Sequence, residues 1–227
     1  MFLLESYNRI QKELSDHEVT LVAVTKTKSI ADILEAYEAG QRDFGENYVQ
    51  ELVDKYEALP KDIRWHFIGH LQSNKVKYIA PFVHLVHGVD SEKLLLEINK
   101  QGAKINRIIP CLLQVYISAE ETKFGLDEQE LEALITGIKT NPEQWKNVEI
   151  RGLMGMASFT EDNDLIITEF TKLRKLFDKH KSQLATTHSP LSILSMGMSA
   201  DYRFGIEAGS TMVRIGSLLF GSRSKGI

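Results

Sequence analysis

Short apolar runs alternate with amphipathic helical segments along the whole chain, and this alternation constrains the fold more than any other sequence feature. Most of the runs are nearly continuous in apolar residues, which is typical of parallel strands covered on both faces. The length of 227 residues is close to the roughly 250 of one (β/α)8 barrel, so we expect a single domain over residues 1–227. The runs expected to form strands are residues 21–24, 43–45, 66–68, 83–86, 108–115, 150–154, 193–196 and 212–215.

Capping signals mark the starts of helices between these runs. Ser29 with Asp32, and Asp127 with Glu130, have the spacing of a capping box, in which each side chain bonds the other residue's backbone N–H. Asp90 is expected to cap a further helix over residues 91–101. These signals place helices between successive strands, as a βα-alternating fold requires.

Strands that alternate with helices fit either a closed barrel or an open doubly wound sheet. No G-x-G-x-x-G follows the first run, so the dinucleotide-binding signature of many open sheets is missing. The end of the chain instead has the pattern of a barrel phosphate site. The sequence therefore predicts an α/β fold, a single (β/α)8 (TIM) barrel with an additional N-terminal helix.

Composition and charge restrict the partners and the compartment. The net charge of -4 argues against a general binder of nucleic acid or acidic membranes. Residues 1–14 read as an amphipathic helix and not as a signal peptide, and no run approaches the ~20 apolar residues of a membrane span. Cys111, the only cysteine, lies in an apolar run and is expected to be a core residue. We expect a cytoplasmic protein that is a monomer or a weak dimer, with no nucleic-acid or membrane partner.

Two small, donor-rich loops near the end of the chain suggest a phosphate site. Gly216 and Ser217 follow the run at residues 212–215, and Met198 and Ser199 follow the run before it. In barrels, phosphate often binds the loops after strands 7 and 8, against the N-terminus of a short helix. Two ordinary strand-to-helix turns would show the same residues.

Lys26 and Arg214 complete a possible site for a phosphorylated aldehyde. Lys26 follows the first run by two residues, at the end where barrel active sites are built. Desolvation there would favour the neutral amine, which attacks aldehydes. Arg214 lies within the last run and faces either the barrel interior or solvent. A strand-end amine, a phosphate cradle and an interior arginine together suit pyridoxal 5′-phosphate (PLP).

At these residues the chain resembles the YggS/PROSC family of pyridoxal phosphate homeostasis proteins over nearly its whole length. This resemblance implies a barrel like the N-terminal domain of alanine racemase, with PLP held as a Schiff base on Lys26. It also implies that Ser199, Gly216 and Ser217 hold the phosphate and that Arg214 faces the pyridine nitrogen. The motifs that carry it are Val22-Ala-Val-Thr-Lys-Thr-Lys28, Phe44-Gly-Glu-Asn-Tyr-Val-Gln-Glu51, Trp65-His-Phe-Ile-Gly-His-Leu-Gln-Ser-Asn-Lys75, Gly152-Leu-Met154, Ser195-Met-Gly-Met-Ser199 and Gly209-Ser-Thr-Met-Val-Arg-Ile-Gly216.

The family resemblance implies a role in intracellular PLP (vitamin B6) homeostasis without an established catalytic reaction. Alanine racemases carry a further β domain with a second catalytic base, for which this chain is not expected to have room. An arginine at the ring nitrogen stays protonated and leaves that nitrogen without a proton, which weakens the ring as an electron sink. We therefore expect a PLP carrier, with PLP-dependent apoenzymes as possible acceptors. The alternatives are a PLP-dependent amino-acid enzyme such as a weak racemase, and a PLP-free barrel enzyme that acts on sugar phosphates.

Weaker candidates remain open. Asn47 and His66, each near the carboxyl end of a strand, could line the PLP pocket or make only local turn bonds. His66 and His70 have an H-x3-H spacing, but an apparent strand and loop do not place them on one helical face, so no metal site is expected. Lys123, in the loop after the fifth run, could receive or relay the aldehyde or be a solvated loop residue.

Overall fold

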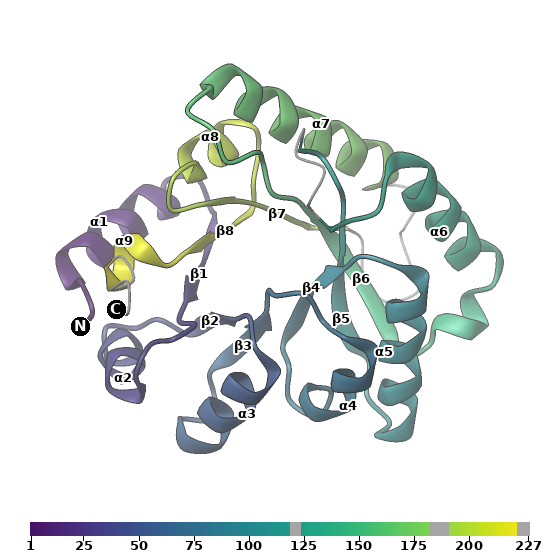
Figure 1. Ribbon diagram of the computed structural model, residues 1–227, viewed down its shortest axis with the longest axis horizontal. Coiled ribbons are helices and arrows are strands. Elements are labelled where there is room, and N and C mark those ends of the chain that lie inside the picture. The colour runs from purple at the N-terminus through teal and green to yellow at the C-terminus, as the bar shows by residue number, and fades with distance from the viewer. Residues whose placement is uncertain (119–123, 182–190, 222–227) are drawn as a thin grey trace.

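The computed structural model describes residues 1–118, 124–181 and 191–221, and within these ranges parallel strands close into one barrel. Each strand pairs with the next along the chain, and β8 pairs with β1 to complete the ring (Figure 1). The expected (β/α)8 barrel is therefore confirmed. The strands are β1 (Thr20–Val24), β2 (Asp43–Glu46), β3 (Arg64–Phe67), β4 (Leu85–Val89), β5 (Ile109–Gln114), β6 (Val148–Met154), β7 (Ile193–Met198) and β8 (Met212–Ile215).

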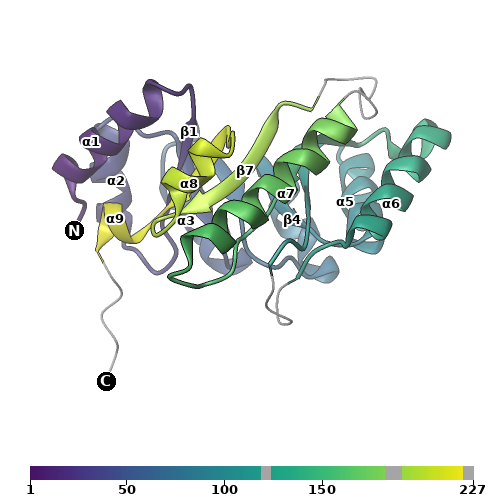
Figure 2. The ribbon, with the colours of Figure 1, turned by 90° about the horizontal axis from the view of Figure 1, so that it is seen from above.

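Helices surround the barrel, and α1 is the additional N-terminal helix that the sequence predicts (Figure 2). None of the helices in the described part of the chain is both long enough and apolar enough to span a membrane. The α-helices are α1 (Leu4–Ser15), α2 (Ile30–Glu38), α3 (Val49–Ala58), α4 (Val76–Ile79), α5 (Glu92–Lys104), α6 (Glu128–Thr140), α7 (Asn163–Lys181), α8 (Tyr202–Glu207) and α9 (Ser217–Phe220), with 3-10 turns η1 (Ser73–Lys75) and η2 (Pro142–Trp145).

Local sequence signals explain where the helices begin. Both predicted capping boxes are present, at Ser29 with Asp32 and at Asp127 with Glu130. The prediction that Asp90 caps α5 is wrong, because Ser91 accepts the hydrogen bond from the backbone N–H of Leu94. The carboxylate of Asp90 instead bonds His70. A serine next to the aspartate was the better-placed cap, and sequence alone did not separate the two.

The expected strand boundaries are correct for β8, and the starts of β3, β4 and β6 each differ from the expected residue by two positions. β4 begins at Leu85, two residues later than expected, because the backbone N–H of Val83 still bonds the carbonyl of Ile79 in the turn after α4. β3 begins at Arg64, two residues earlier than expected. Arg64 is charged, and a charged residue does not read as the start of a buried strand. Its guanidinium is paired with Asp43 on the neighbouring strand β2.

The apolar core has two parts. The larger part lies between the barrel and its helices and includes Cys111, which is fully buried, as expected. A smaller cluster lies inside the barrel and includes Val22, Leu85 and Met212. Several polar side chains share this interior, and they connect the two ends of the barrel.

Strand register determines which loops meet above the barrel. Because β1 and β8 are parallel neighbours, with Val22 opposite Arg214 and Ala23 opposite Ile215, their carboxyl ends lie side by side. The loop that carries Lys26 therefore meets the turn at Gly216 and Ser217. β7 pairs with β8 and brings its own carboxyl end to the same place.

Candidate functional site

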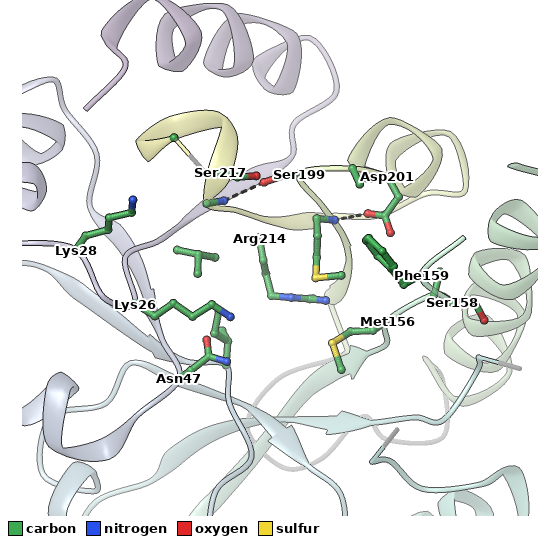
Figure 3. Close-up of a pocket in the computed structure, with 17 residues that line it drawn as sticks. Lys26, Lys28, Asn47, Met156, Ser158, Phe159, Ser199, Asp201, Arg214 and Ser217 are labelled. Atoms are coloured by element: carbon green, nitrogen blue, oxygen red, sulfur yellow. Dashed lines mark hydrogen bonds between the residues drawn. The ribbon is translucent and has the colours of Figure 1, made fainter. Parts of the chain in front are cut away.

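A pocket of about 470 Å³ opens at the carboxyl ends of the strands, within the ~300–1,000 Å³ usual for small-molecule sites. Figure 3 shows Lys26, on the loop after β1, and Arg214, on β8, pointing into it, with Ser199 and Ser217 together at one side. Its wall is mainly apolar. The lining residues are Val24, Lys26, Lys28, Asn47, Ile68, Met156, Ala157, Ser158, Phe159, Met198, Ser199, Ala200, Asp201, Arg214, Gly216, Ser217 and Gly221.

The loop that carries Lys26 is fixed by a network behind it. Thr27 has a positive φ of 65°, a left-handed conformation that is uncommon for a threonine. The backbone N–H of Thr27 donates to Glu51 Oε1 at 2.5 Å. The ammonium of Lys55 donates to the carbonyl of Thr25 and to Glu51 Oε1, each at 2.7 Å. These bonds stabilise an unfavourable backbone turn next to the half-buried Lys26.

Glu46 anchors this network inside the protein. It is fully buried, and it accepts from Lys55 at 2.7 Å and from the Thr25 hydroxyl at 2.5 Å. Burial raises the pKa of Glu46, while the charge of Lys55 acts against this rise. The pair therefore holds β1, β2 and α3 together beneath the loop of Lys26.

The two loops predicted to hold phosphate meet at the opposite wall. The backbone N–H of Gly216 donates to Ser199 Oγ at 3.2 Å, which joins the end of β8 to the end of β7 (Figure 3). Gly197 has φ of +98°, and a Cβ there would lie 2.8 Å from Tyr202 Cα, so the turn before Ser199 requires glycine. The exposed Ser217 begins α9, where the first backbone N–H groups of a helix have no intrahelical acceptor.

The alternatives for Arg214 are decided in favour of the barrel interior. Its side chain is buried and donates from Nη1 to Ser195 Oγ at 2.5 Å and to the Ser195 carbonyl at 2.9 Å. Nη2 donates to the Gly155 carbonyl at 3.1 Å. Burial lowers the pKa of Arg214 to about 10, so the guanidinium remains charged at neutral pH. This arginine contributes a held, permanent positive charge to the floor of the pocket.

Most of the residues selected from the sequence lie at this pocket. Lys26, Asn47, Met198, Ser199, Arg214, Gly216 and Ser217 all line it. Lys28 lines it as well, but its ammonium donates to the carbonyl of Phe220 at 2.8 Å. Lys123 lies outside the described residues. The sequence reasoning missed the loop at residues 156–159, although its position after β6 was a usable signal, because barrel sites are built from the loops that follow strands.

The expectation that His66 could line this pocket is wrong. β3 starts earlier than expected, and the His66 side chain lies toward the amino ends of the strands. Its ring nitrogens are 3.0 Å from Asp43 Oδ1 and 2.9 Å from His87 Nε2. It lines a second cavity, of about 270 Å³, at the opposite end of the strands. The residues around this second cavity are Thr20, Asp43, Arg64, His66, His84, Leu85, Pro110, Arg151, Ile193 and Met212.

The second cavity contains charges that already pair with one another. Arg64 donates to both carboxylate oxygens of Asp43, at 2.7 and 2.5 Å, and Arg151 lies 3.4 Å from Glu149. Asp43, His66 and His84 offer possible ligand atoms within 4.8 Å of one another. Both carboxylate oxygens of Asp43 accept hydrogen bonds from Arg64, and Oδ1 also lies 3.0 Å from His66 Nε2. Hydrogen bonds therefore already occupy the carboxylate of this cluster.

Comparisons with known proteins identify the relatives of this chain. Residues 3–224 match the family model of the alanine racemase N-terminal domain. A pyridoxal phosphate homeostasis protein of Vibrio cholerae is 42% identical over 210 residues, which cover 90% of this chain and 86% of the relative. The homeostasis protein of Synechocystis is 39% identical and covers 98% of this chain and 100% of the relative. PipY of Synechococcus elongatus, solved with PLP bound, superposes with a TM-score of 0.86 at 33% identity, covering 96% of this chain and 99% of PipY.

Proposed function

Because the chain belongs to the pyridoxal phosphate homeostasis proteins, within the family of the alanine racemase N-terminal domain, we propose that it binds PLP and contributes to intracellular vitamin B6 homeostasis. PLP is the ligand of the similar protein PipY. The observation that carries the proposal is the position of Lys26, which lines the same pocket as Arg214 and the Ser199 and Ser217 loops. We propose that Lys26 forms the Schiff base.

The donor groups of the β7 and β8 loops suit a phosphate. Ser199 and Ser217 supply hydroxyls, and Gly216 has no side chain to keep an anion from the backbone. A Cβ at Gly216 would lie 3.3 Å from both Val24 Cβ and the Val24 carbonyl, so the turn has little room for a larger residue. We propose that these three residues hold the phosphate.

The floor of the pocket suits an aromatic ring with a basic nitrogen. Arg214 keeps two Nη1 bonds and one Nη2 bond to the protein and still lines the pocket, where we propose that it faces the ring nitrogen. The buried Oδ1 of Asn47 has no hydrogen-bond partner in the described part of the chain, so this side chain has capacity for a ligand. Met198 supplies apolar contact at the same wall.

We propose a carrier rather than an enzyme with rapid turnover. PLP, when bound, supplies an aldehyde for exchange between amines and a ring that can act as an electron sink. Arg214 stays charged near neutral pH, so it does not leave a proton on a ring nitrogen, and the sink is weakened. Exchange of one amine for another does not need that sink. The relatives named above are homeostasis proteins, which fits this role.

Absorption spectroscopy with borohydride reduction tests the proposal. The protein loaded with PLP should show a visible imine band, and reduction should fix the cofactor onto Lys26, identified by peptide mass spectrometry. Lys26→Ala should lose the adduct. Lys28→Ala is the matched variant and should keep it, because the Lys28 ammonium is held by Phe220. An adduct on any other lysine, or one that survives in Lys26→Ala, contradicts the assignment.

The enzyme alternative makes a different prediction. A weak racemase or similar enzyme would exchange the α-hydrogen of an amino acid with solvent deuterium at a steady rate, and Lys26→Ala would abolish this exchange. A carrier causes no exchange of the α-hydrogen beyond the background of free PLP.

We also propose that apoenzymes in the cytoplasm accept PLP from this protein. Transfer from the loaded protein to a purified apoenzyme, faster than from the same amount of free PLP, would support it.

A further inference from the structure

Five interior side chains form a continuous line from the floor of the pocket to the second cavity. Asp43 Oδ1 lies 3.0 Å from His66 Nε2, and His66 Nδ1 lies 2.9 Å from His87 Nε2. His87 Nδ1 lies 3.2 Å from Ser195 Oγ, which accepts from Arg214 Nη1 at 2.5 Å. The line starts on β2, passes through β3 and β4, and crosses the barrel to β7 and β8. We call it the interior chain.

The interior chain is shielded from water along its length. None of its five residues is more than 8% exposed, and His87 and Ser195 are fully buried. Val22, Leu112 and Met154 belong to the apolar cluster inside the same barrel. In such surroundings each hydrogen bond is strengthened and each unmatched polar atom is costly. One consistent arrangement of donors and acceptors should therefore dominate.

Charged groups fix the roles at both ends. A guanidinium can only donate, so Ser195 must accept from Arg214. Burial alone would raise the pKa of Asp43, but hydrogen bonds from Arg64 and then from His66 hold it well below its ordinary value. Asp43 is therefore a carboxylate that only accepts. With an acceptor at the Asp43 end and a single N–H on each histidine ring, the intervening bonds must all point toward Asp43.

The direction determines the tautomer of each histidine. Burial lowers the pKa of His87 well below the ordinary histidine value, so this ring carries a single N–H. The Ser195 hydroxyl donates to His87 Nδ1, which leaves His87 Nε2–H to donate to His66 Nδ1. His66 Nε2–H then donates to Asp43. The reverse order, with His66 still neutral, would place an unprotonated His66 Nε2 against the carboxylate, two acceptors face to face.

We infer that Asp43, His66, His87 and Ser195 are positioning residues that hold Arg214 in place through one hydrogen-bond chain running in a single direction. The Ser195 hydroxyl donates its hydrogen bond to His87 Nδ1, and its oxygen accepts from Arg214 Nη1. Three of the five N–H groups of Arg214 are thereby held, by Ser195 and Gly155, and the others can meet an acceptor in the pocket. The effect on PLP rests on the function proposed above, whereas the tautomers do not.

Nitrogen NMR of the protein without PLP tests the direction of the chain. In ¹⁵N-histidine-labelled protein at neutral pH, long-range proton–nitrogen spectra distinguish the two neutral tautomers and the imidazolium. His66 and His87 should both appear as Nε2–H tautomers, assigned with His66→Gln and His87→Gln. A wild-type Nδ1–H tautomer at either ring, or a doubly protonated His66, would overturn the inference without any variant of Asp43.

Asp43→Asn should reverse the chain from its far end. Arg64 donates to both oxygens of Asp43, so the introduced amide must turn its NH2 toward one Arg64 donor whichever way it lies. Where the NH2 takes the Oδ1 position, it also faces His66 Nε2 as a donor. His66 should then become the Nδ1–H tautomer, and His87, in the next position, should follow. His84→Gln is the matched control, because His84 lines the same cavity outside the interior chain. A change confined to His66 in Asp43→Asn would mean that the chain does not transmit its direction.

Ser195→Ala tests the hold on Arg214. The loss of a bond to a charged group should speed PLP release by about tenfold or more. Ser210→Ala is the matched control, because it removes another buried hydroxyl, one whose hydrogen-bond partners are backbone groups of Leu194, Met196 and Met212. Equal release rates in the two variants would overturn the positioning role while leaving the proposed function intact. If neither the wild-type protein nor any variant binds PLP, the proposed function fails. The histidine tautomers, which are measured without PLP, still test the direction of the interior chain.

Discussion

The two ends of the barrel both carry a cavity lined by basic residues, but they differ in how those residues are arranged. In the cavity at the amino ends of the strands, Arg64 is paired with Asp43 and Arg151 lies near Glu149. In the pocket at the carboxyl ends, Lys26, Arg214 and two serine hydroxyls surround a space with mainly apolar walls. The difference teaches that clustered charge alone does not mark a binding site. A set of donors that converge on an open space between apolar walls does.

Removing the pocket hydroxyls should have the largest effect. Ser199→Ala with Ser217→Ala should weaken PLP binding by roughly 3–6 kcal/mol, because each hydroxyl bond to a charged phosphate contributes about 1.5–3 kcal/mol. The dissociation constant, measured by titration of the imine band, checks this. Ser158→Ala is the control at the same pocket, because that hydroxyl donates to Glu169. Wild-type affinity in the double variant would remove the distinction between the two ends.

Breaking an ion pair at the amino-terminal cavity should affect stability and spare binding. Arg64→Ala leaves Asp43 with His66 as its donor, and the free energy of unfolding should fall by about 1–2 kcal/mol, since the arginine is partly exposed. Denaturant unfolding without PLP measures this loss. PLP affinity should stay within about twofold of wild type. A large loss of affinity at unchanged stability would make this cavity part of the binding site.

Acid should destabilise the protein through His84 and His87, two histidines with lowered pKa values. Burial lowers the pKa of His87 well below 6.5 and that of His84 to about 4, so the unfolded chain takes up these protons before the folded protein does. The free energy of unfolding should therefore fall as the pH drops below 6.5. The slope from His87 is up to about 1.4 kcal/mol per pH unit, and His84, which is solvent-exposed, contributes less.

Unfolding curves between pH 7.5 and 5 without PLP measure this slope. His84→Gln should make the slope shallower and leave its sign unchanged. A protein that becomes more stable over this range as the pH falls would contradict the neutral state of both rings.

The sequence predicts the barrel and most of the pocket for the same physical reason. Parallel strands buried on both faces leave apolar runs, and the residues after each run must gather at one end, which is why the sequence predicts Lys26 and Ser217 at the pocket. The interior chain left no such signal. Asp43 and His66 look like ordinary polar residues near short strands, and a shift of two residues in β3 was enough to place His66 at the wrong end. Pairing across the barrel, such as His87 with Ser195 at 108 residues' separation, depends on closure and register.

The ring closure between β1 and β8 has a consequence for how this protein is made. Lys26 and the turn at Gly216 and Ser217 are far apart in the sequence and meet only when β1 pairs with β8. The N-terminal segment also needs α9 in place, since the backbone N–H of Leu3 bonds the carbonyl of Leu219. A chain still emerging from the ribosome therefore has no pocket to offer until β8 has left the exit tunnel. The proposed binding of PLP would then be confined to chains in which β8 has closed the ring, and it would favour the closed ring over any partly assembled state.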